Sequence, residues 1–288
     1  MHTPYNEIIL KTSPLGISLA FYTGQSGYRP FHWHDAMEIL YPLNGKSDIY
    51  IDGISYSLKN KQLIVIDSQK IHSTYHYEDG AMVLCIHIIK KALNYYFPKI
   101  MNYHIQCCPD HIPDSKFTDY VEMNQFLQRI TELYIKESPT FLLESEGLVM
   151  QLLSRLLLCF SSDSAPLLSA VNKTAMDRIR QVISYTEAHY KEPIALQDAA
   201  SLLNVGKEYF CRFFKKNMGI SYLQYVNQVR AVHIYQNLVH TDMPIGIIME
   251  QNRFTNQKLC NRIFKELYGC TPSQIRKSAY NALSRHEP

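Results

Sequence analysis

One ten-residue pattern occurs twice in the C-terminal half of this chain. Residues 212–221 read RFFKKNMGIS, and residues 262–271 read RIFKELYGCT. Each copy has Arg, one apolar residue, Phe and Lys, then after three residues Gly, and two positions later Ser or Thr. Repetition at a fixed period indicates a duplicated structural unit. We therefore expect two copies of one small fold in this half of the chain.

Each repeated stretch ends a pair of short helical patterns joined by a tight turn. In the first pair, LQDAASLL and KEYFCRFFKKNMG flank the turn NVG; in the second, PIGIIMEQ and NQKLCNRIFKELYG flank the turn NRFT. A longer helical pattern, SYLQYVNQVRAVHIYQNLV, connects the two pairs. A short helix, a turn of three or four residues and a second helix is the helix-turn-helix arrangement, whose second helix enters the major groove of DNA. We predict two such units, at residues 196–217 and 244–268.

The second helix of each unit has a polar face whose side chains are suited to DNA. Its apolar face is expected to contain Phe210, Phe213 and Phe214 in the first unit, and Leu259, Ile263 and Leu267 in the second. Arg and Lys can donate to guanine, Asn and Gln can pair with adenine, and Lys one turn further on is better placed for phosphates. Any exposed helix has a polar face, so the prediction depends on two such faces in register. The candidate DNA-binding residues are Lys207, Glu208, Cys211, Arg212, Lys215, Lys216, Asn256, Gln257, Lys258, Asn261, Arg262 and Lys265.

Charge is distributed unevenly along the chain. The net charge is +3, but residues 174–288 contain 15 Lys or Arg against 9 Asp or Glu, an excess of six, and the remainder has 14 against 17. The C-terminal part is therefore the one suited to a polyanion. A non-specific nucleic-acid packaging protein would need far more positive charge than this.

The first 160 residues predict a different architecture. Up to about residue 90, short apolar runs such as MEILYPL, SDIYIDG and QLIVID lie between turn residues, a spacing typical of an antiparallel barrel or sandwich. Asp52-Gly53 between two β-rich runs predicts a hairpin. The fold class is therefore α+β in two domains: residues 1–160, a β-barrel with a helical hairpin at 117–160, and residues 174–288, all α-helical. The polar stretch at 161–173 is the expected linker.

The helical hairpin is expected to use two apolar faces. Phe117, Val121, Asn124, Leu127 and Tyr134 mark the first helix, and Leu142, Val149, Leu153, Leu156 and Phe160 mark the second. This surface could cover the barrel, a partner subunit, or both. We expect a homodimer formed through these helices.

The sequence of residues 176–278 resembles the DNA-binding domain of AraC/XylS-type transcription regulators. The ending is the most specific part: Phe264-Lys265, Gly269, Thr271-Pro272 and Arg276. The resemblance implies one domain whose two units enter successive major grooves on one face of DNA. Arg253 stands where this family usually has a turn Gly, and we expect the neighbouring Asn252 to take the left-handed conformation in its place.

A second resemblance concerns FHWHDAMEILYPLNG, which is similar to the first motif of the cupin barrel. It contains His32, His34 and Glu38, and His72 stands where the second cupin motif has its His. In metal-dependent cupins such residues converge on Fe, Mn, Zn or Ni. Alternate residues of one strand share a face, and imidazole with carboxylate suits these ions. These four residues are therefore candidates for an effector pocket or for a divalent metal site, and His76 and His87 are given only a core or surface role.

Two functions are compatible with features of the whole chain. The preferred one is a cytoplasmic transcription regulator without catalytic residues, whose barrel binds a small-molecule effector and whose C-terminal domain binds specific double-stranded DNA, with RNA polymerase as a further candidate partner and no membrane association. The alternative is a metal-dependent cupin dioxygenase or isomerase using His32, His34, Glu38 and His72; it leaves the C-terminal resemblance unexplained. The seven cysteines include no CxxC pair and are expected to be reduced, packed thiols without a metal role.

Overall fold

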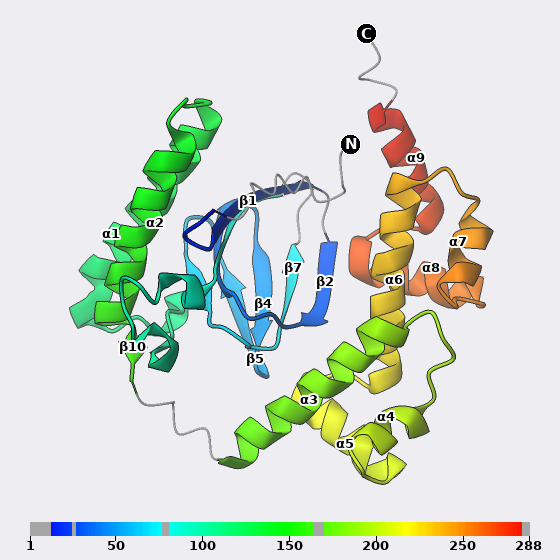
Figure 1. Ribbon diagram of the computed structural model, residues 1–288. Coiled ribbons are helices and arrows are strands. Elements are labelled where there is room, and N and C mark those ends of the chain that lie inside the picture. Colours follow the sequence, from blue (N-terminus) through cyan, green and yellow to red (C-terminus); the bar gives the residue numbers. More distant parts are fainter. Residues whose placement is uncertain (1–12, 25–26, 77–80, 164–169, 284–288) are drawn as a thin grey trace.

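The computed structural model describes residues 13–24, 27–76, 81–163 and 170–283. Strands and a helical pair occupy residues 13–163, here called the sheet region, and helices occupy residues 170–283, here called the helical region (Figure 1). The predicted α+β organisation is confirmed. No helix among the described residues is both long enough and apolar enough to cross a membrane.

Two four-stranded antiparallel sheets form the sheet region. Their strand orders are β1-β8-β3-β6 and β2-β7-β4-β5. In the described part of the chain no strand pairing joins the two sheets, so the expected barrel is a sandwich without full closure. The strands are β1 (Ile17–Gly24), β2 (Gly27–His32), β3 (Met37–Asn44), β4 (Ser47–Ile51), β5 (Ile54–Leu58), β6 (Ile64–Ile66), β7 (His72–His76) and β8 (Ala81–Ile88), with a separate pair β9 (His104–Ile105) and β10 (Ser161–Ser162).

The hairpin predicted at Asp52-Gly53 is present. Ile51 pairs with Ile54 across a two-residue turn, and both turn residues have positive φ, 47° for Asp52 and 92° for Gly53. Two positive φ values match a turn whose twist suits the flanking strands. The carboxylate of Asp52 adds a reason for Asp at this position, because it accepts from the backbone N–H of Ile71 and the ammonium of Lys70.

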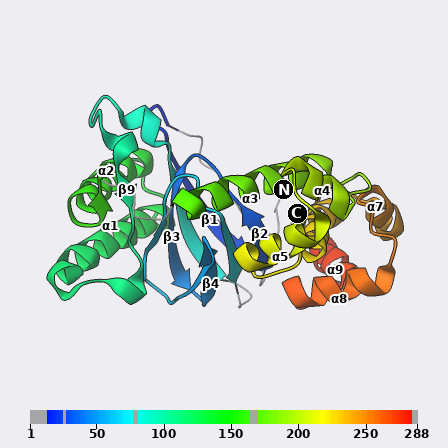
Figure 2. The ribbon, with the colours of Figure 1, turned by 90° about the horizontal axis from the view of Figure 1, so that it is seen from below.

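The helical pair covers the outer face of the first sheet. Helices α1 (Phe117–Ile135) and α2 (Phe141–Cys159) lie along that sheet on the side away from the helical region (Figures 1 and 2). Buried side chains such as Met123, Leu127 and Leu152 share one apolar core with Ile39 of β3. Four short 3-10 helices precede α1: η1 (Lys90–Leu93), η2 (Ile100–Asn102), η3 (Pro109–His111) and η4 (Asp114–Lys116).

The predicted apolar face of α1 is partly wrong. Leu127 is buried, but Phe117 and Val121 are 59% and 39% exposed, and Tyr120, Met123 and Ile130 face the sheet instead. In α2, Val149, Leu153, Leu156 and Phe160 are buried as expected, whereas Leu142 is exposed. The inward face is set by the sheet against which the helix packs, and the sequence has apolar residues on both sides of α1.

Seven helices form the described helical region. They are α3 (Ala170–His189), α4 (Leu196–Leu202), α5 (Lys207–Met218), α6 (Tyr222–His240), α7 (Ile245–Gln251), α8 (Gln257–Tyr268) and α9 (Pro272–Leu283). Helix α3 begins within the stretch expected as a linker, and residues 164–169 of that stretch lie outside the described residues.

Two separate apolar cores hold this region together, one for each predicted unit. The first contains Phe210, Phe214 and Tyr225; the second contains Phe264, Leu267 and Ile234. Helix α6 supplies residues to both cores. Its 19 residues therefore run from the first unit to the second.

Candidate nucleic-acid interface and histidine cluster

The two predicted helix-turn-helix units share one turn geometry. Asn204 has φ 54° and Arg253 has φ 55°, and the residue after each donates to a carbonyl five positions back, Val205 to Ala200 and Phe254 to Met249. The turns differ in length by one residue. In the first unit the N-cap of α5, Gly206, comes two residues after Asn204; in the second the N-cap of α8, Asn256, comes three residues after Arg253.

The expectation for Asn252 is wrong. Asn252 has φ −97°, and Arg253 itself takes the left-handed conformation, at a cost of about 1 kcal/mol. Asn252 is buried, and its side-chain amide donates to the carbonyl of Ile248. Arg253 in turn donates through Nε to the carbonyl of Lys191 at 3.1 Å. Asn252 is therefore fixed as part of the core and is not available to form the turn.

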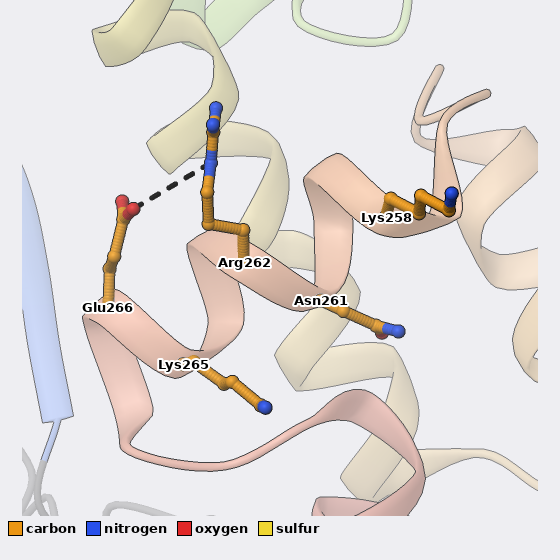
Figure 3. A pocket seen from close by; sticks show the side chains of 5 residues that line it. All are labelled: Lys258, Asn261, Arg262, Lys265 and Glu266. Atoms are coloured by element: carbon orange, nitrogen blue, oxygen red, sulfur yellow. Dashed lines mark ion pairs between the residues drawn. The ribbon is translucent and has the colours of Figure 1, made fainter.

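The second helix of each unit is called its reading helix below. On α8, the exposed face carries Lys258, Asn261, Arg262, Lys265 and Glu266, which together line a shallow hollow (Figure 3). Arg262 is 69% exposed, and its Nε lies 3.8 Å from Glu266 Oε1. An ion pair this open to water contributes little stability, so the guanidinium can exchange Glu266 for another acceptor at small cost.

Asn256 differs from the other candidates on α8. Its side-chain oxygen accepts from the backbone N–H of Leu259 at 3.0 Å, which makes it the N-cap of the reading helix. Loss of such a cap costs about 1 kcal/mol. Gln257 is exposed beside it, in the first turn of α8.

On α5, most of the candidate residues are exposed. Lys207, Glu208, Arg212, Lys215 and Lys216 all face solvent. Cys211 is only half-exposed and packs against the first apolar core, which makes it a weaker candidate for base contact. Tyr209 is 48% exposed on the same helix and is not among the predicted DNA-binding residues.

The inward faces of the reading helices follow the prediction closely. Phe210 and Phe214 on α5, and Ile263 and Leu267 on α8, are buried. Phe213 is half-buried, with its ring 5.5 Å from the guanidinium carbon of Arg178. Leu259 is also half-buried, and Cys260 and Phe264 complete the inner side of α8.

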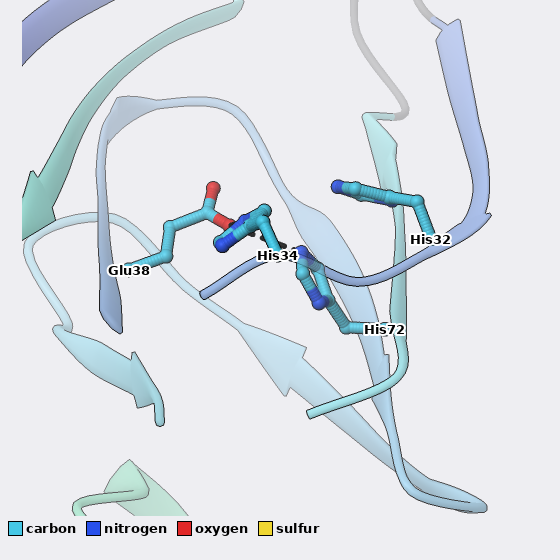
Figure 4. Close-up of side chains that lie close together, drawn as sticks. All are labelled: His32, His34, Glu38 and His72. Atoms are coloured by element: carbon cyan, nitrogen blue, oxygen red, sulfur yellow. Dashed lines mark hydrogen bonds and ion pairs between the residues drawn. The ribbon is translucent and has the colours of Figure 1, made fainter. Parts of the chain in front are cut away.

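The four residues of the cupin resemblance meet in the sheet region (Figure 4). His32, His34, Glu38 and His72, here called the histidine cluster, each offer an atom within 4.8 Å of the others. Glu38 Oε2 lies 3.1 Å from His34 Nε2 and 3.0 Å from His72 Nε2. The rings of His32 and His72 are 4.1 Å apart at their centroids. The cluster is tightly packed, with room between the donor atoms only for a ligand the size of an ion.

The backbone orients all three imidazole rings in the same way. His32 Nδ1 lies 2.9 Å from the carbonyl of Pro30, His34 Nδ1 the same distance from that of Ala36, and His72 Nδ1 from that of Lys70. A nitrogen this close to a carbonyl must carry the hydrogen, which leaves Nε2 of a neutral ring as an acceptor directed at the cluster. His32 Nε2 is buried without a hydrogen-bond partner.

This arrangement fits a divalent cation. Three Nε2 acceptors facing a buried carboxylate repel one another unless protons or a metal ion lie between them. Burial raises the pKa of the Glu38 carboxyl, but the adjacent imidazoles of His34 and His72 hold that pKa well below its usual range. Burial also holds the pKa of His32 well below its usual range. The residues that would hold a metal are therefore His32, His34, Glu38 and His72.

Cys85 and His87 also contact Glu38. Cys85 Sγ donates to Glu38 Oε1 at 3.1 Å, and His87 Nε2 lies 3.9 Å from the same oxygen. Both residues belong to β8, and neither was predicted to face this cluster. Their spacing, Cys-x-His in a strand, was the signal that could have found them, because alternate residues of a strand share a face.

Stability is expected to fall as the pH drops below about 6.5. Burial lowers the pKa of His76 to about 4, and its Nδ1 lies 2.8 Å from Ser47 Oγ. An unfolded His takes up a proton near pH 6.5 that the folded His76 does not, so the unfolded state binds more protons between these two values. Each such histidine contributes a slope of at most about 1.4 kcal/mol per pH unit. Urea unfolding at pH 7.5, 6.0 and 5.0, beside His76→Gln as control, measures this slope; equal slopes in both proteins would contradict the assignment.

A cavity of about 440 Å³ lies at the open edge of the sandwich, between β5, β6 and the chain before η3. Apolar side chains including Ile51, Tyr56 and Phe160 form its walls. Four basic side chains also line it, Lys70, His104, His111 and Lys116, together with the carboxylates of Asp52 and Asp67. Ser161 and Ser162 of β10 also line it, directly before the stretch that leads to α3. No sequence signal indicated this cavity, because its walls come from five separate segments.

Strand β2 joins the sheet region to the helical region. Phe31 is buried in the first helical core, and its carbonyl accepts from the hydroxyl of Tyr225 at 2.9 Å. Tyr28 packs against the second helical core, and its hydroxyl donates to Gln228 at 3.3 Å. The same strand ends at His32 of the histidine cluster.

Comparison with known proteins identifies the helical region. A family model described as a helix-turn-helix domain matches residues 199–278, which run from α4 into α9. The helical region is therefore a helix-turn-helix domain, with both predicted units inside the matched residues except for the first three residues of α4. It is, more particularly, a domain of the AraC type.

Longer similarities extend beyond this domain. An uncharacterised HTH-type transcriptional regulator of Staphylococcus aureus (strain COL) is 22% identical over 243 residues, which cover 84% of this chain and 31% of that protein. The regulatory protein PocR of Salmonella typhimurium is 23% identical over 173 residues, 58% of this chain and 51% of PocR. The chain thus spans about a third to a half of the length of these relatives. Among solved structures, ToxT from Vibrio cholerae O395 with (E)-4-(8-methylnaphthalen-1-yl)but-3-enoic acid aligns over 91% of this chain and 99% of ToxT, at 12% identity and a TM-score of 0.47.

Proposed function

We propose that this protein is a sequence-specific DNA-binding transcription regulator. The observation that carries the proposal is the pair of exposed reading helices, each held on a buried aromatic core and each presenting Arg and Lys side chains to solvent. Arg262 and Asn261 on α8, and Arg212 on α5, have the donor groups that read base edges in the major groove. The metal-dependent enzyme considered above accounts for the histidine cluster but not for these two helices.

The direct test is selection of bound sequences from random double-stranded DNA by the full-length protein. Two reading helices should enrich two short half-sites at a fixed separation of about one helical turn, roughly 34 Å. Sequences recovered without any common element would contradict sequence-specific binding. A single enriched half-site would contradict the assignment of α5 or of α8.

Arg262→Ala and Lys216→Ala are expected to change DNA binding in different ways. Arg262 is placed to read a base, so its loss should cost about 1–3 kcal/mol at the selected site and relax the preference at one position. Lys216 lies in the last turn of α5 and is placed for a phosphate; its loss should weaken all sequences alike and reduce the salt slope by about one. Binding to selected and random DNA across a salt series measures both. Equal losses on the two DNAs for both variants would overturn these roles.

Control by a small ligand belongs to the same proposal. The histidine cluster suits an ion, and the 440 Å³ cavity suits a small organic molecule with an apolar body and an anionic group. Apolar side chains form much of its wall, and four basic side chains line it beside two carboxylates, Asp52 and Asp67, that already pair with Lys70 and Lys90. Ligand binding can shift DNA binding only by its differential affinity for two arrangements, typically 1–3 kcal/mol. Strand β2 is the element through which we expect that difference to pass, since it contacts both helical cores.

The remaining partners are also proposals. Exposed apolar side chains on α1 and α2, among them Leu143 and Leu158, support a homodimer formed through these helices. RNA polymerase remains a candidate partner for a regulator of this class. Since its target is chromosomal DNA, we place the protein in the cytoplasm. The limits expected for the two domains, 1–160 and 174–288, stay predictions.

A further inference from the structure

The carboxylate of Glu38 has a different set of partners on each oxygen. Oε2 faces His34 and His72, as described above. Oε1 faces Cys85 and His87, which belong to neither cupin motif. The three groups on the Oε1 side are therefore a distinct donor set: a carboxylate, a thiol and an imidazole.

Strand register brings these three side chains together. In the antiparallel pair β3–β8, Glu38 lies directly opposite His87, and Cys85 lies two residues before His87 on the same strand. Opposite residues in such a pair and alternate residues of one strand point to the same face. The pairing of β3 with β8 therefore brings the side chains of Glu38, Cys85 and His87 together without any contribution from a loop.

The distances match those between ligands of one metal ion. Zinc binds sulfur at about 2.3 Å, imidazole nitrogen at about 2.0–2.1 Å and carboxylate oxygen at about 2.0–2.2 Å, so ligand atoms in a tetrahedral site are about 3.3–3.6 Å apart. Here Cys85 Sγ is 3.1 Å from Glu38 Oε1 and 3.8 Å from the His87 ring nitrogens, and His87 Nε2 is 3.9 Å from Glu38 Oε1. A turn of the His87 ring that directs one nitrogen at the ion, with shifts of up to about half an ångström, would complete the geometry.

The charges of these side chains and the solvent exposure of the site also favour binding of a divalent metal ion. A thiolate and a carboxylate together supply two negative charges, which balance a divalent cation in a site where Glu38 and Cys85 are buried. Imidazole and thiolate are ligands that zinc prefers. His87 and His34 are 22% and 25% exposed, and their rings lie 5.2 Å apart at the centroids, so one side of the site is open to solvent.

We propose that Glu38, Cys85 and His87 form a binding site for a thiophilic divalent cation such as Zn²⁺, with the fourth position open toward solvent. On binding, the Cys85 thiol releases its proton to water and the sulfur bonds the metal. The proposal departs from the expectation that the cysteines have no metal role and that His87 is only a core or surface residue. The proposal does not depend on the proposed DNA binding, so either can fail without the other.

Cobalt provides the test, because Co²⁺ replaces Zn²⁺ and a cobalt–sulfur bond gives an intense near-ultraviolet charge-transfer absorption. Titration of the metal-free, reduced, full-length protein with Co²⁺ should produce this band, and Zn²⁺ should abolish it. The band should be absent in Cys85→Ser and retained in Cys108→Ser, a matched change of another buried cysteine in the core between the sheets. It should also be retained in His32→Ala, which alters only the histidine cluster.

Each of three outcomes of the cobalt titration would overturn the proposal, and a fourth comes from the His87 variant described below. The first three are no Co²⁺ binding, a cobalt spectrum without the sulfur band, or a band that persists in Cys85→Ser. Circular dichroism and urea unfolding of each variant distinguish loss of the site from loss of the fold. As a second variant that keeps the thiol, His87→Gln should weaken Co²⁺ binding at least tenfold while leaving the band visible at high Co²⁺, and unchanged affinity would likewise contradict the assignment.

Discussion

Asp67→Ala should lower the free energy of unfolding of the sheet region by about 3–5 kcal/mol. Asp67 and Lys90 form an ion pair in which both side chains are buried. Asp67 also accepts from the backbone N–H groups of Ser68 and Ile105, at 2.8 and 3.1 Å. Removing the carboxylate leaves the ammonium of Lys90 buried, with only the carbonyl of Tyr103 beside it at 3.0 Å. Urea unfolding followed by circular dichroism measures the loss.

The double variant Asp67→Ala with Lys90→Met is the control. Because it removes the unpaired charge as well as its partner, it should be more stable than Asp67→Ala alone. A double variant less stable than the single one would show that the cost comes from the backbone contacts of Asp67. Asp52→Ala, which removes a more exposed pair with Lys70, should cost less.

Phe214→Ala should destabilise the helical region by about 3–5 kcal/mol and weaken DNA binding at temperatures where the region then unfolds. The Phe214 ring is fully buried, with centroids 5.2 Å from Tyr222 and 5.8 Å from Tyr225. Its loss leaves a cavity between α5 and α6 and removes support from Tyr225, which bonds to Phe31 of β2. Thermal unfolding beside a DNA-binding titration is the measurement.

The neighbouring Phe213 provides the matched control. It is the same residue type, one position earlier on the same helix, but it is half-buried under Arg178. Phe213→Ala should therefore cost clearly less than Phe214→Ala. Similar costs for the two variants would mean that α5 is not fixed to its core in the way described.

The elements that could be predicted from the sequence are those in which the helical period is strong and repeated. The pattern around Phe210 and Phe214, and its copy at Ile263 and Leu267, predicted two short helices and their inner faces, because inward residues recur at helical spacing. The Asp52-Gly53 turn was predictable for a similar reason, since few residue pairs accept two positive φ values.

Elsewhere the sequence is compatible with more than one side-chain face, turn conformation or strand register. In α1 apolar residues occur on two faces, and only the sheet surface determines that Met123 turns inward and Phe117 outward. The role of Arg253 depends on Asn252 already being held in the core, which is a tertiary effect. Cys85 and His87 reach Glu38 through the register of β3 with β8, and register is not readable from either strand alone.

Strand β2 contacts both helix-turn-helix units, which affects how the DNA-binding surface can respond to a ligand bound in the sheet region. Since its six residues place Tyr28 against one helical core and Phe31 against the other, a single displacement of this strand alters both units together. A conformational change that begins at His32 would therefore reach both helix-turn-helix units through this one strand. Their response would be concerted, with the affinities for the two half-sites changing in step and the separation between the half-sites unchanged.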